Sequence, residues 1–167
     1  MHADFDRGSE QAQPAETSLL KRREIEAQIA VPLILAFAEK MGRERAFAVA
    51  RDVIQKLAQA AGREMAKRLG VNDLTTFAKV VRDVWAQDNA LEITVLEETD
   101  CRLSFDVTHC AYAELYEKLG MKEFGYCLSC SRDAGFAEGF NPRLKLQRTG
   151  TIMEGAPHCD FRFNKVE

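Results

Sequence analysis

Two hydrophobic periods follow one another along the chain, and the change between them divides it into a helical part and a strand-rich part. Up to residue 89, apolar residues recur three or four positions apart, which is typical of amphipathic helices. From residue 90, stretches in which apolar and polar residues alternate predict half-buried strands. We therefore predict an α+β fold, in which amino-terminal helices pack on one side of a mainly antiparallel four-stranded sheet.

The helical part contains three predicted helices. The first begins at Thr17 or Ser18, which can cap it, contains Pro32 as a predicted kink and ends near Gly42. Its apolar face is formed by residues four positions apart: Ile25, Ile29, Leu33, Phe37 and Met41. The second helix runs over 44–69, and its seam of small and apolar residues predicts close packing on a neighbour: Ala46, Ala50, Val53, Leu57, Ala61 and Met65. Asn72 is the predicted cap of a third helix that carries Trp85 and stops at 87–89.

The strand-rich part contains two predicted hairpins. Alternation over 91–95 and 101–107, with a polar turn between them, predicts the first hairpin, in which Cys101 is expected to be a buried, inert thiol. The second joins 144–146 to 159–163 and turns Cys159 toward the helices, with His158 and Asp160 on the other face. Between the hairpins we expect a short helix ending at Gly120, an irregular stretch over 121–130 and another short helix over 131–140.

Composition predicts one domain. With 167 residues, 46% of them hydrophobic, the chain can bury one core of good size. We expect a disordered tail at 1–17, which includes His2, and a single α+β domain at 18–167. Its helical part is 18–89, and its strand-rich, cysteine-containing part is 90–167.

Charge and cysteine content narrow the class of partner. A formal net charge of −3 argues against nucleic acid and against a basic membrane surface, and favours a small-molecule substrate. The amino terminus lacks the pattern of a signal peptide, and the longest apolar run, 29–38, is too short to span a bilayer. We predict a cytoplasmic protein whose five cysteines are free thiols or metal ligands. The long first two helices can also pair with a second copy, as a homo-oligomer.

The candidate chemistry gathers in 108–162, which holds four of the five cysteines. Cys110 is predicted in the first turn of a helix, where peptide dipoles favour a thiolate and lower the pKa. Cys110, Cys130 and Cys159 would leave one open position on a tetrahedral ion, as at a catalytic zinc. In the rival chemistry one thiolate attacks an electron-poor carbon while Asp133 or His158 carries protons. A third interpretation is that these thiols are core residues.

Other motifs carry less weight. Cys127-x-x-Cys130 alone is a weak sign of a zinc or redox site, because no second pair accompanies it. Arg148, flanked by Thr149 and Thr151, can present a guanidinium and hydroxyls to a substrate carboxylate, or it can lie on a solvated strand face.

Several motifs occur together in one order: Cys110-Ala-Tyr112, Leu119-Gly120, Cys130-x-x-Asp133, Asn141-Pro142, Leu144-x-Leu146-x-Arg148-Thr149-x-Thr151, Gly155 and Cys159-Asp160-Phe161-Arg162. Over about 93–163 this pattern resembles the L-2-amino-thiazoline-4-carboxylic acid hydrolase family. It is also distantly similar to 4-vinyl reductase-type ligand-binding domains, which makes a non-catalytic small-molecule sensor the alternative.

The first resemblance implies the hydrolytic opening of a cyclic amidine-like ring, which converts 2-amino-thiazoline-4-carboxylate toward carbamoyl-cysteine on the route to L-cysteine. It implies a catalytic site of Cys110, Cys130, Asp133 and Cys159, with Asp133 as the proton carrier. Tyr112, Arg148 and Thr149 would bind the substrate, and Arg148 would bind the carboxylate of the substrate. Two mechanisms remain open under this resemblance: attack by water bound to a zinc ion held by the three cysteines, or attack by a thiolate. Other cyclic ureas or thioureas are alternative substrates.

Overall fold

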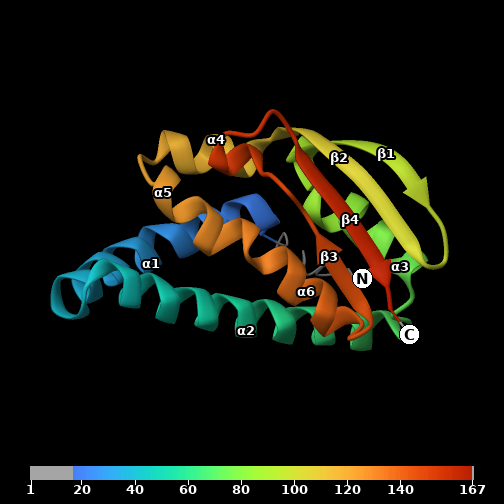
Figure 1. Cartoon of the computed structure of the whole chain (residues 1–167), viewed down its shortest axis with the longest axis horizontal. Helices are drawn as coiled ribbons and strands as arrows, with labels where there is room; N and C mark the ends of the chain where they lie inside the picture. Colours follow the sequence, from blue (N-terminus) through green and yellow to red (C-terminus); the bar gives the residue numbers. More distant parts are fainter. Residues whose placement is uncertain (1–16, 167) are drawn as a thin grey trace, which may run out of the picture.

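A layer of helices covers one face of a four-stranded antiparallel sheet in the computed structural model of this protein, which describes residues 17–166 (Figure 1). The strands are β1 (Leu91–Glu98), β2 (Arg102–Cys110), β3 (Leu144–Gln147) and β4 (Cys159–Lys165), arranged in the order β1-β2-β4-β3. The predicted fold class is confirmed. Of the predicted tail, all but Thr17 lies outside the described residues, and so does His2.

Most of the helical layer comes from the first half of the chain. The α-helices are α1 (Leu19–Met41), α2 (Arg43–Leu69), α3 (Leu74–Val80), α4 (Ala111–Lys118), α5 (Lys122–Gly125) and α6 (Arg132–Phe140). Two π-helical turns, η1 (Val81–Trp85) and η3 (Tyr126–Cys130), continue α3 and α5, and the 3-10 turns are η2 (Gln87–Asn89) and η4 (Ile152–Glu154). In the π-helical turns the amide of residue i donates to the carbonyl of residue i−5: Ala86 donates to Val81 and Ser131 to Tyr126.

The inner face of the sheet forms the main core. In β2 and β4 every second residue is buried, and the register places Phe105 opposite Phe161 with their rings stacked at 4.8 Å between centroids. From the helical side, Phe77 of α3 packs edge-on against Phe163 of β4, at 4.9 Å between ring centroids, and against Phe140 of α6. The predicted period of two was therefore correct in both strands, including the inward direction of Cys159, which is buried.

The first two helices form a long hairpin that turns at Gly42, whose φ of 86° is readily adopted only by glycine. Ser18 caps α1 by accepting a hydrogen bond from the amide of Lys21, as predicted, and α1 continues through Pro32. The apolar face predicted for α1 is not its buried face. The buried residues of α1 are Ala27, Val31 and Ile34, whereas all five residues of the predicted face are exposed.

The second helix packs closely on α6 through glycines. A Cβ built on Gly62 would lie 2.1 Å from the carbonyl oxygen of Phe136, and one on Gly139 would lie 2.1 Å from that of Gln59. The predicted close packing is present, but the buried line of α2 is Ala46, Ile54, Ala58 and Gly62, which shares only Ala46 with the predicted seam. Val53 and Leu57 of that seam are exposed.

Three local predictions were wrong. Asp73, not Asn72, caps α3, since its carboxylate accepts the amide hydrogen of Thr76. Cys101 is exposed, because it lies in the turn before β2 and beyond the edge of the core. The stretch 121–130 is helical, and Gly125 serves a close contact there, since a Cβ would lie 2.2 Å from the sulfur of Met153.

None of the helices between residues 17 and 166 combines the length and the apolar character that crossing a bilayer requires.

Candidate functional site

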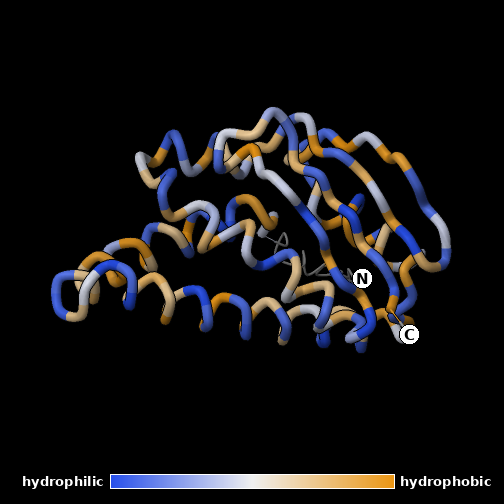
Figure 2. The backbone as a smooth tube through the Cα atoms, in the orientation of Figure 1, coloured by the Kyte–Doolittle hydropathy of each residue, from blue (hydrophilic) through white to orange (hydrophobic). Residues whose placement is uncertain are grey.

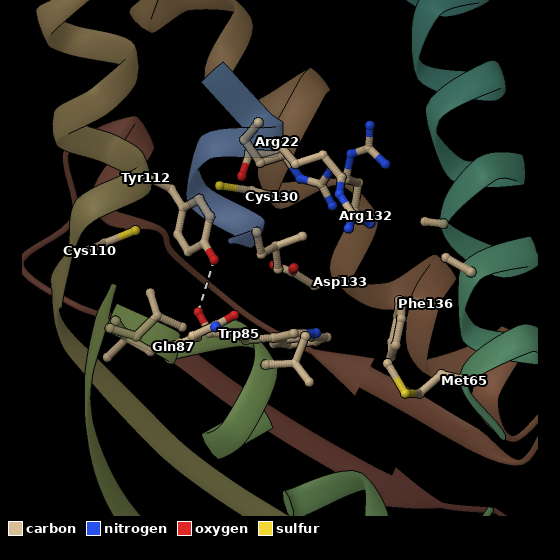
Figure 3. Close-up of a pocket in the computed structure, with 18 of the residues that line it drawn as sticks. Arg22, Met65, Trp85, Gln87, Cys110, Tyr112, Cys130, Arg132, Asp133 and Phe136 are labelled. Carbon is tan, nitrogen blue, oxygen red and sulfur yellow. Dashed lines mark hydrogen bonds between the residues drawn. The ribbon is translucent and has the colours of Figure 1, made fainter. Parts of the chain in front are cut away.

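A pocket of about 460 Å³ lies between the helical layer and the inner face of the sheet. It gathers side chains from elements far apart in the sequence, as the close-up in Figure 3 shows for Cys110, Cys130, Asp133 and Trp85. Six of the seven predicted site residues line it: Cys110, Tyr112, Cys130, Asp133, Arg148 and Cys159. The seventh, Thr149, does not.

Cys110 stands where β2 ends and α4 begins, as the residue that precedes the first turn of the helix. The backbone N–H groups of Tyr112 and Ala113 lie near its sulfur, without forming a cap hydrogen bond, and favour a thiolate, which is the effect that the sequence predicted. Burial outweighs them and raises the pKa of the Cys110 thiol to about 11. The prediction of a lowered pKa was therefore wrong, and the resting thiol is protonated at neutral pH.

The other two thiols of the pocket are also held in the neutral form. Cys130 is the last residue of η3, and burial raises the pKa of its thiol well above the usual range. Burial likewise raises the pKa of Cys159, although the amide of Ile152 donates to its sulfur at 3.2 Å. Backbone amides accompany the sulfur of Cys110, those of Tyr112 and Ala113, and the sulfur of Cys159, that of Ile152, so both thiols have backbone groups that favour negative charge.

Asp133 and Arg148 form an ion pair in the wall of the pocket, with 2.6 Å between Oδ2 and Nη1. Burial raises the pKa of the Asp133 carboxyl, and Arg148 holds back that rise. Arg148 also donates from Nη2 to the carbonyl of Cys130 at 3.0 Å, and its guanidinium lies 4.8 Å from the ring centroid of Phe161. Arg148 thus fixes the position of Asp133 and the end of η3, and both of its Nη atoms already have partners.

Tyr112 joins α4 to the turn η1. Its hydroxyl donates to the carbonyl of Trp85 at 2.9 Å, the bond drawn in Figure 3. Burial raises the pKa of Tyr112 above its usual range, so the phenol stays a donor. Trp85 is both buried and part of the pocket wall.

The remaining candidates lie elsewhere. Thr149 is exposed and donates from its amide and its hydroxyl to Asp160, at 2.8 to 3.0 Å. His158 is on the outer face of the sheet, 4.0 Å from Asp106, and Cys127 is buried away from the pocket. Neither belongs to the candidate site.

The sequence interpretation missed the contribution of the first two helices. Arg22, Arg23 and Met65 line the pocket, together with Arg132 and Phe136 of α6. Arg132 and Arg23 both bind the carboxylate of Glu26, at 2.8 and 2.6 Å. Charged residues at the start of an amphipathic helix are typical of a solvated face, so no signal in the sequence distinguished these from others.

A preformed metal site is not evident. Within residues 17–166, no three or more His, Cys, Asp and Glu side chains are grouped so that they could hold a metal ion. Cys110, Cys130 and Cys159 share the pocket without forming such a group, and the zinc considered from the sequence stays a prediction.

The comparison with protein families decides the class of protein. A family model described as L-2-amino-thiazoline-4-carboxylic acid hydrolase matches residues 22–163. The chain belongs to this family. The resemblance predicted from the motifs is thereby confirmed, and in this thiazoline carboxylate hydrolase family member the match includes every residue of the candidate site. No curated protein sequence matches the chain.

Two solved structures of other proteins are similar to this chain. Trafficking protein particle complex subunit 3 from Naegleria fowleri, crystallised covalently bound to palmitic acid, is similar with a TM-score of 0.53 and 12% sequence identity. The match covers 88% of this chain and 96% of that one. The phenol-responsive sensory domain of the transcription activator PoxR, solved with phenol, is similar with a TM-score of 0.46 and 13% identity, over 88% and 72% of the two chains.

Proposed function

We propose that this protein hydrolyses a small cyclic amidine of the thiazoline class, L-2-amino-thiazoline-4-carboxylate or a related cyclic C–N or C–S compound, in the pocket described above. The observation that carries the proposal is that Cys110, Cys130, Cys159 and Asp133 line one cavity in a member of the thiazoline carboxylate hydrolase family. The ring carbon between sulfur and nitrogen is the electrophile. A thiol and a carboxylate in one hollow supply the nucleophile and the proton carrier that its hydrolysis needs.

Cys110 is the nucleophile in this proposal. Its thiol is neutral, so it needs a base before it can attack, and the substrate brings one in the ring nitrogen of the amidine. That nitrogen takes the thiol proton as the sulfur adds to the ring carbon. The N–H groups of Tyr112 and Ala113 stabilise the charge that develops on the sulfur. Collapse of the tetrahedral intermediate breaks the ring C–S bond, leaving a protonated isothiourea (isothiouronium) on Cys110 and a thiolate on the opened substrate.

Water completes the reaction with Asp133 as proton carrier. The other carboxylate oxygen of Asp133, Oδ1, takes a proton from water as the water oxygen adds to the isothiourea carbon, and this proton then passes to the departing sulfur of Cys110. The second proton of water ends on the thiolate of the product, and the oxygen becomes the carbonyl of the carbamoyl group. Arg148 keeps Asp133 in place through Oδ2. Neither Asp133 nor Cys110 is consumed, and one water is added.

The test measures ring opening by the purified protein supplied with L-2-amino-thiazoline-4-carboxylate. We expect one new thiol per carbamoyl-cysteine formed, and a loss of at least 100-fold in kcat/KM in Cys110→Ser and Asp133→Asn, because each removes a group that takes part in the chemistry. Cys101→Ser, which changes an exposed thiol outside the pocket, is the matched control and should keep full activity. Mass spectrometry of quenched reactions should find the isothiourea on Cys110. Full activity in Cys110→Ser would exclude this cysteine as the nucleophile.

A second candidate function is a non-catalytic small-molecule sensor, and one observation favours it. Burial raises the pKa of all three pocket thiols, and neutral thiols are suited to lining an apolar binding pocket. Binding of the thiazoline carboxylate without any release of product thiol would support the sensor and contradict the hydrolase.

A further inference from the structure

We propose, as an extension of the proposed function, that the substrate is a carboxylated cyclic amidine that also carries an apolar ring substituent, such as an aryl group. Arg22 would bind its carboxylate. The apolar end of the pocket, which we define by Met65, Trp85 and Phe136, would hold the substituent. The three observations behind this inference are the size of the pocket, the partners of its arginines and the separation of its two ends.

The pocket is larger than the unsubstituted thiazoline needs. A volume of about 460 Å³ falls within the range of roughly 300–1,000 Å³ found for pockets that enclose drug-sized ligands. L-2-amino-thiazoline-4-carboxylate has nine non-hydrogen atoms and would leave most of this space to water. Because much of the lining is aromatic or aliphatic, a ligand that fills the space with apolar atoms gains from displacing that water.

Five arginines line the pocket, and two of them, Arg22 and Arg68, form no ion pair within residues 17–166. Arg68 donates to the sulfur of Met65 at 3.2 Å, so Arg22 is the one whose guanidinium remains available. Arg148 is engaged by Asp133 and by the carbonyl of Cys130. Arg23 and Arg132 share the single carboxylate of Glu26. Within residues 17–166, Arg22 forms neither a side-chain hydrogen bond nor an ion pair, and it lines the pocket beside Cys130 and Arg132 (Figure 3). A carboxylate can therefore bind there without displacing a protein partner.

The two ends of the pocket have different chemistry. Figure 3 shows Cys110, Tyr112 and Cys130 at one end, Asp133 between, and Phe136 and Met65 at the other end beside α2. Trp85 is in edge-to-face contact with Phe136, at 5.7 Å between ring centroids. A ring held at the sulfur of Cys110 thus has its substituent directed toward an aromatic and thioether surface.

Trp85 provides the measurement, since it is the single tryptophan of the chain and lies in the pocket wall. Its fluorescence is titrated in the Cys110→Ser protein, which blocks turnover, with three probes. These are 2-amino-thiazoline-4-carboxylate, its 5-phenyl derivative and the 4-carboxamide of that derivative. We expect the phenyl carboxylate to bind at least tenfold more tightly than the unsubstituted carboxylate.

Two substitutions then separate the two contacts. Arg22→Gln should weaken binding of the phenyl carboxylate about tenfold and leave the carboxamide unchanged, whereas Arg63→Gln, an exposed arginine of α2 outside the pocket, should change neither. Ala61→Phe, which adds a ring at the pocket wall on α2, should weaken the phenyl probes and spare the unsubstituted one. Ala61→Leu is the smaller replacement if the phenylalanine impairs folding.

Equal binding of the phenyl and unsubstituted carboxylates, or equal loss of carboxylate and carboxamide binding in Arg22→Gln, would overturn this inference. The proposed function fails in a different way, namely when the wild-type protein opens none of these rings although the probes bind with the expected differences.

A second, independent observation concerns the outer side of the α1–α2 hairpin. Eight large apolar side chains on this hairpin are between 40% and 62% exposed: Ile25, Ile29, Leu33, Phe37, Met41, Val49, Val53 and Leu57. We call them the hairpin face. Several of them line a groove of about 240 Å³ between the two helices, and Figure 2 shows hydrophobic segments recurring along both helices.

We infer that the hairpin face binds the same face of a second copy of this chain. With these exposed fractions the eight side chains present on the order of 800 Å², which matches what one partner contributes to an interface of standard size and exceeds the few hundred Å² usual on a monomer. Two such hairpins related by a twofold axis would place ridges of one copy in the groove of the other, as in a four-helix bundle.

Light scattering coupled to size-exclusion chromatography tests this inference over a range of protein concentrations. We expect a dimer for the wild-type protein and a monomer for Phe37→Glu and for Val53→Glu, with ring-opening activity retained, because neither residue lines the candidate site. Leu35→Glu is the matched control, an exposed leucine of α1 outside the hairpin face, and should remain a dimer. A wild-type protein that stays monomeric at every concentration would refute the dimer.

Discussion

At the scale of single residues, burial controls the chemistry of this site more than sequence position does. Cys110 has the helix amides that lower a thiol pKa, yet its pKa is about 11, because little water reaches the sulfur. The helix amides beside Cys110 can be predicted from the sequence, because periodicity indicates where a helix starts. The burial of the thiol cannot, because the elements that cover it are distant in the chain. Six of the seven residues predicted from the sequence line one pocket, but their ionisation could not be predicted.

Thiol reactivity should follow this difference. At pH 7.5 iodoacetamide should modify the exposed Cys101 at least tenfold faster than Cys110, and modification of Cys110 should accelerate as the pH rises toward 11, where its thiolate forms. Peptide-level mass spectrometry of time courses measures both rates. A Cys110 that reacts as fast as Cys101 at pH 7.5 would show that its pKa is not raised.

The Asp133–Arg148 pair makes a second prediction at this scale. Asp133→Asn leaves the guanidinium of Arg148, whose side chain is 8% exposed, without its countercharge, and should lower the free energy of unfolding by about 3 kcal/mol. Asp133→Leu combined with Arg148→Met should lower the free energy of unfolding by less than Asp133→Asn alone, because no unpaired charge remains buried. Urea denaturation of the variants provides the comparison, and a double variant less stable than the single one would argue against this account.

At the scale of elements, periodicity identified almost every helix and strand but not which helix face is buried. The exposed row of α1 is larger and more hydrophobic than its buried row of Ala27, Val31 and Ile34, so the sequence pointed to the wrong side. Residues 121–130 were predicted to be irregular because Gly120 and Gly125 resemble helix breakers. Gly125 instead lies against the side chain of Met153, a contact between segments that the sequence does not show as neighbours.

The crossing of α2 and α6 supports a graded test at this scale. Gly139→Ala should destabilise the protein by about 3 kcal/mol, since its Cβ would lie 2.1 Å from a backbone oxygen of α2 and the helices must separate. Gly135→Ala on the same helix meets its nearest atom at 3.0 Å and should cost clearly less. Thermal unfolding followed by circular dichroism gives the order, and equal stability of the two variants would contradict the close crossing.

At the scale of the whole molecule, the buried thiols and phenols link stability to pH. Burial raises the pKa values of Cys110, Cys127, Cys130 and Cys159, and those of Tyr112 and Tyr116. An unfolded thiol loses its proton near pH 8.5, whereas Cys110 keeps its proton up to about pH 11. In this window the folded state binds more protons than the unfolded state, so stability falls as the pH rises.

We therefore expect the urea midpoint to decrease steadily from pH 8 to pH 10.5. Cys110→Ala should flatten part of this decrease, because it removes one of the groups whose pKa burial raises in the folded state. A midpoint that is constant, or that rises, over this range would contradict the raised pKa values.

The two π-helical turns give the molecule one further property. Each ends at a residue of the pocket wall, η1 at Trp85 and η3 at Cys130. A π-turn holds one residue more than the α-turn it replaces, so removing that residue rotates the preceding part of the helix by about 100° relative to the residues after the turn. Gain or loss of a single codon in either segment is therefore enough to bring the indole or the sulfur into the cavity or to turn it away. Length variants among natural relatives should mark changes of ligand at these two places.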